Sequence, residues 1–146
     1  QSIWGSGPND VWALGGTGIA RKRSDGSWTT EFPGPMSGLQ KIWGSGPNDV
    51  YTMRGPEIFH TTGDGKWSAQ TVQTVDPFEG LFSVWGSGPD DVYFGSSHGG
   101  LYHSLGDGRW FRETVDPEIR LDIESIWGTS KNNVYIYANG RVYHGR

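Results

Sequence analysis

The sequence predicts an all-β fold made of short antiparallel strands joined by tight turns. Three observations carry this prediction: 24 of the 146 residues are glycine, aromatic residues make up 14% of the chain, and hydrophobic residues make up only 34%. Short aromatic strands between glycine turns have this composition, whereas helical domains do not. No stretch shows the 3.6-residue periodicity of an amphipathic helix. The length is that of one domain with a modest core.

A repeat of about 40 residues organises the whole chain. Its first copy begins IWGSGPNDVW at Ile3, and close copies begin at Ile42, Val84 and Ile126. Each copy starts with an apolar run that ends in Trp-Gly, followed by a turn and a Val-aromatic run. A glycine-containing break, a third apolar run, an Asp-Gly turn and a run that begins with Trp complete the unit. This order predicts four strands of about five residues in each repeat.

Each predicted element has a physical reason. In the first strand, Ile42 and Trp43 are neighbours that point to opposite sides, and both residue types recur, so this strand is buried on both faces. The Gly-Pro-Asn/Asp-Asp turn follows, where Pro presets φ and the Asn or Asp side chain bonds the backbone two residues on. Between the third and fourth strands, a glycine such as Gly26 supplies the positive φ of a tight hairpin.

Four-stranded units of this size, with the first strand buried between stacked sheets, are the blades of a β-propeller. The predicted domain spans residues 1–146, with blades at 3–41, 42–83, 84–125 and 126–146. The last blade lacks its outer strand. Either the chain closes as a four-bladed ring with one thin blade, or it forms part of a larger ring completed by a longer chain or by a second copy. Because an open array leaves blade faces exposed, we favour the second alternative.

The motifs also carry a family resemblance. The order (I/V)WGSGPNDV(W/Y), Gly-x-Ile/Leu-x-His and Asp-Gly-x-Trp resembles the tandem repeats of a group of bacterial β-propeller proteins. The segment from Ser24 to Trp28 is more distantly similar to the turn of Asp-box (BNR-like) propellers, although it is shorter. The resemblance implies the fold and leaves the activity open, since propellers include enzymes, lectins and protein-binding scaffolds.

Composition and motifs exclude several functions. The net charge of -4 gives no basic footprint for nucleic acid, and no apolar run approaches the length of a membrane span. The chain has no cysteine, which weakly favours a secreted or cell-envelope location. It carries no nucleophile elbow, phosphate loop or His-Glu-x-x-His motif. A glycosidase, which the Asp-box resemblance raises, needs two converging carboxylates. We therefore expect neither enzymatic activity nor a cofactor.

Several recurring residues are predicted to be structural. The first-strand tryptophans Trp4, Trp43, Trp85 and Trp127 are expected to pack between blades, and the fourth-strand tryptophans Trp28, Trp67 and Trp110 are expected to be structural. Three histidines, His60, His103 and His144, share one repeat position, where the first blade has Arg21. Equivalent positions in different blades lie far apart, so we expect these histidines to bond neighbouring turns rather than a metal. Single aspartates in the turns are expected to cap the backbone rather than to bind calcium.

Differences between the repeats locate the candidate binding site. The first-to-second and third-to-fourth turns share one rim and hardly vary, whereas the second-to-third turns and the fourth-to-first connections share the other rim and differ in every blade. Variable loops on a rigid frame are where binding usually occurs. The candidate ligand contacts are Arg54, Glu57, Phe78, Glu79, His98, Glu118, Arg120 and Asn139. They suit lectin-like carbohydrate recognition, and recognition of a protein ligand is only slightly less favoured. The alternative function is a scaffold module that oligomerises or docks in a larger assembly.

Overall fold

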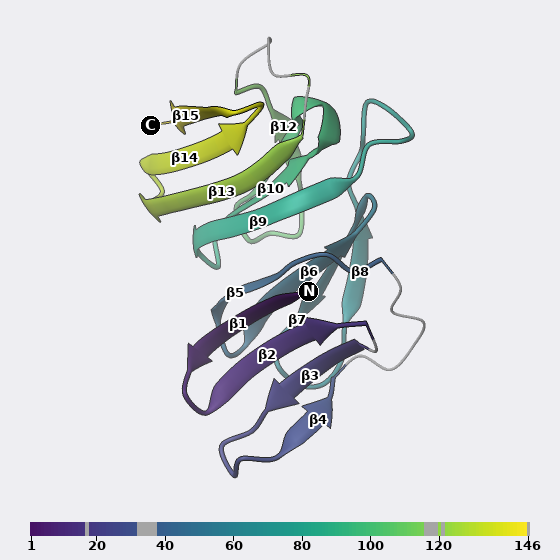
Figure 1. The fold of residues 1–146 in the computed structure, drawn as a ribbon, viewed down its shortest axis with the longest axis vertical. Coiled ribbons are helices and arrows are strands. Elements are labelled where there is room, and N and C mark those ends of the chain that lie inside the picture. Colours follow the sequence, from purple (N-terminus) through teal and green to yellow (C-terminus); the bar gives the residue numbers. More distant parts are fainter. Residues whose placement is uncertain (17, 32–37, 116–119, 121, 146) are drawn as a thin grey trace.

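The computed structural model describes residues 1–16, 18–31, 38–115, 120 and 122–145, and these residues form an all-β fold. Their strands make four antiparallel sheets, and each sheet contains consecutive strands in sequence order. Figure 1 shows the sheets stacked one after another, with the first sheet (purple) at one end and the fourth (yellow) at the other. The predicted architecture of propeller blades is confirmed.

The strand bounds follow the repeat. The first blade contains β1 (Ser2–Gly7), β2 (Asp10–Gly15), β3 (Gly18–Lys22) and β4 (Trp28–Thr30). The second contains β5 (Ile42–Gly46), β6 (Asp49–Arg54), β7 (Glu57–Thr61) and β8 (Ser68–Thr71). The third contains β9 (Leu81–Gly88), β10 (Asp91–Ser96), the 3₁₀ turn η1 (Ser97–Gly99), β11 (Leu101–Ser104) and β12 (Phe111–Glu113). In the described part of the chain, the fourth blade has three strands, β13 (Ile123–Ser130), β14 (Asn133–Ala138) and β15 (Arg141–Gly145).

Two first strands are longer than the repeat boundaries at 84 and 126 imply. β9 starts at Leu81, which pairs with Ser96, and β13 starts at Ile123, which pairs with Ala138. In these two blades, the apolar run before Trp-Gly therefore continues the ladder with the second strand. The residues that begin the two runs, Leu81 and Ile123, are fully buried.

The hydrophobic core lies between the blades. One cluster joins blades one and two, a second joins blades two and three, and a third joins blades three and four. In the first cluster, for example, Trp12 and Ile19 of blade one meet Ile42 and Val50 of blade two. An isolated blade would expose half of each cluster to water, so the blades stabilise one another as neighbours in a repeat protein do.

A tryptophan–glycine contact links successive first strands. A Cβ built on Gly86 would lie 2.5 Å from Cη2 of Trp43, closer than real Cβ atoms approach other atoms. The corresponding distance is 2.7 Å both for Gly44 beneath Trp4 and for Gly128 beneath Trp85. The indole ring of each blade therefore lies on the glycine of the next blade, which explains why Trp and Gly recur side by side.

The Asp-Gly turns have the predicted geometry. Gly26, Gly65 and Gly108 take positive φ angles of 84°, 81° and 78°, which glycine adopts without steric cost. The aspartate of each turn accepts a hydrogen bond from the backbone N–H two residues on, as Asp64 Oδ1 does from Lys66 at 3.0 Å. These turns close the hairpins between the third and fourth strands of blades one to three.

The stack of blades leaves a shared space along the first strands. β1 contacts β5, β5 contacts β9, and β9 contacts β13. A depression of about 260 Å³ is lined by residues of all four of these strands, including Ile3, Trp43, Val84 and Ile126. The first strands of the four blades therefore lie next to one another around one shared depression.

Candidate functional site

A four-residue cluster occupies the same place in every blade, close to the invariant rim. In blade two, His60 Nε2 lies 2.8 Å from Asp49 Oδ1, and the imidazole stacks on Tyr51 with ring centroids 4.3 Å apart. Ser45 Oγ donates to the other carboxylate oxygen of Asp49. The aspartate therefore ties the turn between β5 and β6 to a histidine on β7.

The other blades keep this cluster with substitutions. In blade three, His103 lies 2.9 Å from Asp91 and stacks on Tyr93. Blade four has Asn133 in place of the aspartate, 2.7 Å from His144, which stacks on Tyr135. In blade one, Arg21 donates to Asp10 at 2.7 Å and lies over the ring of Trp12. In every blade, the histidine or arginine on the third strand thus lies over an aromatic ring and hydrogen-bonds an aspartate or asparagine, although the residue types change.

Electrostatics suit an ionised aspartate in this cluster. Burial alone would raise the pKa of Asp49, but hydrogen bonds from His60 and Ser45 outweigh burial and lower the pKa below its ordinary value. Burial, with the nearby charge of Asp49, raises the pKa of the Tyr51 hydroxyl well above its ordinary value. The histidines stand on separate blades, and the structure gives each of His60, His103 and His144 an acceptor in its own blade.

On the variable rim, Glu79 holds a connection in place. Glu79 is only 2% exposed, and its carboxylate accepts hydrogen bonds from Ser96 Oγ, from Tyr102 Oη at 3.0 Å, and from the backbone N–H of Val75 at 3.1 Å. Burial, followed by the charge of Glu79, raises the pKa of Tyr102 to about 12. Glu79 therefore supports the loop from inside and does not reach solvent.

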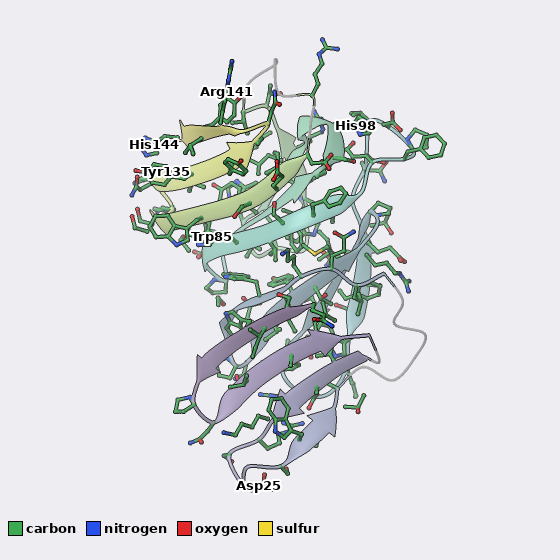
Figure 2. All side chains as sticks on the ribbon, viewed as in Figure 1. Asp25, Trp85, His98, Tyr135, Arg141 and His144 are labelled. Carbon is green, nitrogen blue, oxygen red and sulfur yellow. The ribbon has the colours of Figure 1, made fainter. Side chains whose placement is uncertain are left out.

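This support brings two candidate residues onto one surface. Ser97 N donates to Gly80 O at 2.8 Å, and Gly80 N donates to Ser97 Oγ at 3.0 Å, so the connection before β9 lies against the turn after β10. Phe78 and His98 flank these bonds, and both are exposed. His98 takes a positive φ of 61°. Figure 2 shows it on the rim opposite Tyr135 and His144.

Of the other candidates, Arg54 and Glu57 flank a turn that lies beside this connection, because Leu81 N donates to Gly55 O at 2.8 Å. Arg54 and Glu57 pair with each other at 2.7 Å across the turn between β6 and β7, and Arg54 also lies over Phe59. Asn139, with Asp122, Glu124 and Gly140, lines a shallow depression of about 350 Å³ beside blade four. Arg120 is exposed, and Glu118 lies outside the described residues.

The two end blades expose residues that the inner blades bury. On blade four, Val142 is 67% exposed, whereas its equivalent Leu101 on blade three is 4% exposed. Trp127 is 58% exposed because the described part of the chain places no blade beyond it. On blade one, Ile3 is 71% exposed, whereas its equivalent Ile42 is 4% exposed. We call these surfaces the trailing face, formed by Trp127, Tyr135, Tyr137 and Val142, and the leading face, formed by Ile3, Gly5 and Trp28.

The sequence motifs singled out neither Tyr137 nor Val142. A signal for Val142 was present, because alignment of the repeats puts it in register with Ile19, Ile58 and Leu101, which are all buried against the next blade. Position in the repeat, rather than residue type, therefore identifies the exposed faces.

Comparisons with solved structures agree on the fold. The chain is similar to YCF48 from Cyanidioschyzon merolae (TM-score 0.76, 13% identity, 100% of this chain and 50% of that chain). It is also similar to the extracellular domain of the one-component system BT4673 from B. thetaiotaomicron (0.75, 12%, 97% and 20%). A third match is a catalytically inactive virginiamycin B lyase from Staphylococcus aureus with quinupristin (0.69, 17%, 99% and 54%). The matches include a chain described as a β-propeller domain, and the fold is that of a β-propeller.

These similarities extend to the fold alone. The chain spans about half the length of YCF48 and of the lyase, and a fifth of BT4673. Comparison with protein-family models gives no match, and comparison with curated protein sequences gives none either. Among the described residues, no helix is long and apolar enough to cross a membrane.

Proposed function

We propose that the protein is a non-enzymatic interaction propeller whose end faces join head to tail with a second copy of the chain. The observation that carries the proposal is the exposure of Trp127 and Val142 on the trailing face. The equivalents of Trp127 in the other blades are partly buried, and those of Val142 are buried. Large exposed apolar surfaces on a soluble domain mark interaction sites. A second copy offers its leading face as the partner surface. The contact between a trailing face and a leading face would then repeat the contact between successive blades, which occurs three times within the chain.

The two faces match in detail. Trp127 stands where Trp4, Trp43 and Trp85 stand in the other blades, each over a glycine of the next blade. Gly5 stands at the glycine position of blade one, and the atoms nearest to a Cβ built there belong to Asp10 and Val11 of its own blade. Trp127 of one copy thus fits over Gly5 of the other.

A second pair supports the same arrangement. Within the chain, the fourth-strand Trp67 packs edge-on against Trp12 of the preceding blade, with ring centroids 5.9 Å apart. Trp28 is the equivalent of Trp67 in blade one, and it is exposed. In the head-to-tail arrangement, Trp28 of one copy reaches Tyr135 of the other. Both contacts form at the same joint, between the trailing face of one copy and the leading face of the other.

We expect sedimentation velocity to give a mass twice that of the single chain at micromolar concentration. Val142→Asp should yield the single-chain mass, because it places a charge in an apolar interface. Val75→Asp is the matched control, since Val75 is 71% exposed but belongs to a connection and to neither end face. A wild-type protein that stays at the single-chain mass across the concentration range would overturn the proposal, and so would equal effects of the two variants.

A second candidate function is carbohydrate or peptide recognition on the variable rim. It is favoured by the exposed Phe78 and His98, which the Glu79 network and the bonds between Ser97 and Gly80 present on one surface. An exposed aromatic ring beside polar groups suits either ligand. One of the matching structures is YCF48 bound to the D1 peptide.

A glycan array and a peptide array, probed with the same labelled protein, test this second candidate. Binding should fall at least about tenfold in Phe78→Ala and in His98→Ala if one contact of hot-spot strength is lost. Arg109→Ala on the invariant rim serves as the control. Binding of the protein to glycans alone supports carbohydrate recognition, and binding to peptides alone supports protein recognition. If the protein binds to neither array, this second candidate function is wrong.

The similarity to virginiamycin B lyase, at 17% identity, extends to the fold and gives no reason to propose a lyase activity. The absence of a catalytic motif in the sequence supports the non-enzymatic part of the proposal.

A further inference from the structure

The connection between β8 and β9, residues 72–80, exposes two apolar side chains close together. Among the described residues, Phe78 is the most exposed large hydrophobic side chain, at 89%, and Val75 is 71% exposed. Figure 1 shows this connection projecting from the stack beside the start of β9. It joins blades two and three, which each contain four strands and have a blade on either side, so the exposure of Phe78 and Val75 does not come from an uncovered blade face.

Hydrogen bonds within the tip of the connection close it into a turn. Glu79 N donates to Asp76 O at 3.0 Å, and Phe78 N donates to Asp76 Oδ1 at 2.8 Å. Val75 N donates to Glu79 Oε2 at 3.1 Å. Aspartate at the first position of such a turn and Pro77 at the second are the residues that these positions favour. We call residues 75–78 the anchor turn, and its backbone is held in place before any partner binds.

The base of the connection is bonded to both of the blades that it joins. Val72 N donates to Pro56 O at 3.1 Å, and Leu81 N donates to Gly55 O at 2.8 Å, which fixes the connection to the turn between β6 and β7. On the other side, the buried carboxylate of Glu79 ties it to blade three. Because this order is already present in the folded chain, the anchor turn loses little conformational entropy when it binds.

A projecting, preordered aromatic residue suits the pocket of another protein. Large aromatic side chains that fill a pocket supply most of the binding energy of many protein interfaces. Preorganisation adds to the affinity because it removes the cost of ordering a loop. A lipid surface is a poorer match, since residues 72–80 contain an aspartate and a glutamate but no lysine or arginine to meet anionic headgroups.

The charge beside Phe78 indicates what the edge of that pocket contains. Asp76 is half-buried, and one of its carboxylate oxygens accepts the hydrogen bond from Phe78 N. No ion pair among the described residues includes Asp76. Its other oxygen can therefore pair with a cationic group of the partner, and complementary charges at the edge of an interface guide association.

We propose that the anchor turn inserts Phe78 into an apolar pocket of a different, folded protein, with a lysine or arginine at the pocket edge facing Asp76. Val75 and Pro77 flank the inserted ring and contact the pocket wall. The anchor turn belongs to neither end face, so it acts independently of the joining of two copies. Glycans and short peptides offer no closed pocket, so a protein that binds to neither array can still have this partner.

The first test measures whether the anchor turn is ordered in the free protein. In ¹⁵N relaxation measurements on the full chain, the backbone amides of Val75, Phe78 and Glu79 should give order parameters of about 0.85, as in rigid backbone. Values below about 0.6 indicate a flexible loop and would overturn the proposal, because a flexible loop is not preorganised.

The second test identifies what the ring touches. The photo-crosslinking residue p-benzoylphenylalanine replaces Phe78 in the full chain, expressed in the cells that normally make the protein. The matched control carries it in place of Phe111, which is also aromatic and is 53% exposed on blade three. We expect a protein product from position 78 alone, with the crosslink in an apolar segment that has a lysine or arginine beside it. Lipid products, the same products from both positions, or no product at position 78 would contradict the proposal.

The partner identified in this way is then purified and titrated with variants of the chain. Phe78→Ala should bind about thirtyfold more weakly, as expected for loss of a central aromatic residue, whereas Phe111→Ala should bind as the wild type does. Asp76→Asn keeps an oxygen for the Phe78 N–H and removes only the charge, so it should weaken binding by about threefold and reduce its dependence on salt. Equal affinities of the Phe78→Ala variant and the wild type would show that the ring does not occupy the pocket.

Discussion

Replacing Trp43 by alanine will lower the free energy of unfolding by about 3–5 kcal/mol, the usual cost of removing a large aromatic side chain from a packed site. The Trp43 ring lies on Gly86 of blade three and also stacks on Tyr51 of its own blade, with centroids 6.3 Å apart. Since the glycine leaves no atom that could fill the space, the cavity stays open. Urea unfolding followed by circular dichroism measures the loss.

Trp127→Ala is the matched control for this prediction, because it removes the same side chain from the same repeat position. The ring of Trp127 is exposed, so the expected loss is below about 1 kcal/mol when unfolding is measured at sub-micromolar concentration, where a second copy contributes least. Equal losses in the two variants would show that the contact between Trp43 and Gly86 is not what stabilises the stack.

Replacing Glu79 by alanine is expected to lower the free energy of unfolding by about 3 kcal/mol. The substitution removes the acceptor of the Tyr102 hydroxyl, which is buried, and of the Val75 backbone N–H. Donors left without a partner in the interior cost more than the net value of the bonds themselves. Urea unfolding measures the change, and hydrogen exchange should show faster exchange in the connection before β9.

Glu57→Ala gives the comparison for Glu79→Ala. Glu57 pairs with Arg54 across an exposed turn, and ion pairs in such positions contribute less than about 1 kcal/mol. The sequence places both glutamates among the candidate ligand contacts, yet the structure predicts that only one of them is important for stability. A loss for Glu57→Ala as large as that for Glu79→Ala would contradict this distinction.

Much of the fold could be predicted from the repeat. Alternation of strands and turns, the Asp-Gly hairpins and the three-stranded fourth blade all follow from local sequence, because turn residues and strand lengths act over a few positions. The recurrence of Trp beside Gly also predicted packing between blades, although it did not show that Trp43 lies on Gly86 of the next blade. That contact joins residues far apart in the chain.

The sequence predicted less about the candidate site, because it does not show which candidate side chains face solvent. A glutamate in a variable loop suggests a ligand contact, but whether Glu79 faces solvent depends on Ser96 and Tyr102, which come from other elements. Trp127 has the same sequence context as Trp43, yet it is exposed, because burial depends on whether a neighbouring blade is present. A cavity of about 220 Å³ between blades three and four, lined by Tyr93 and Ile136 among others, likewise depends on residues from separate blades and corresponds to no sequence motif.

The contact between tryptophan and glycine gives the stack a polarity. Every blade presents an indole on one side and a glycine on the other, so the two ends of a stack are chemically different, like the two ends of a filament. Two trailing faces brought together would set indole against indole, with no glycine to receive either ring. Blades can therefore be added only head to tail, with the indole of one blade on the glycine of the next, and the same contact can be repeated for each added blade. The chemistry of the contact itself sets no limit on the number of blades.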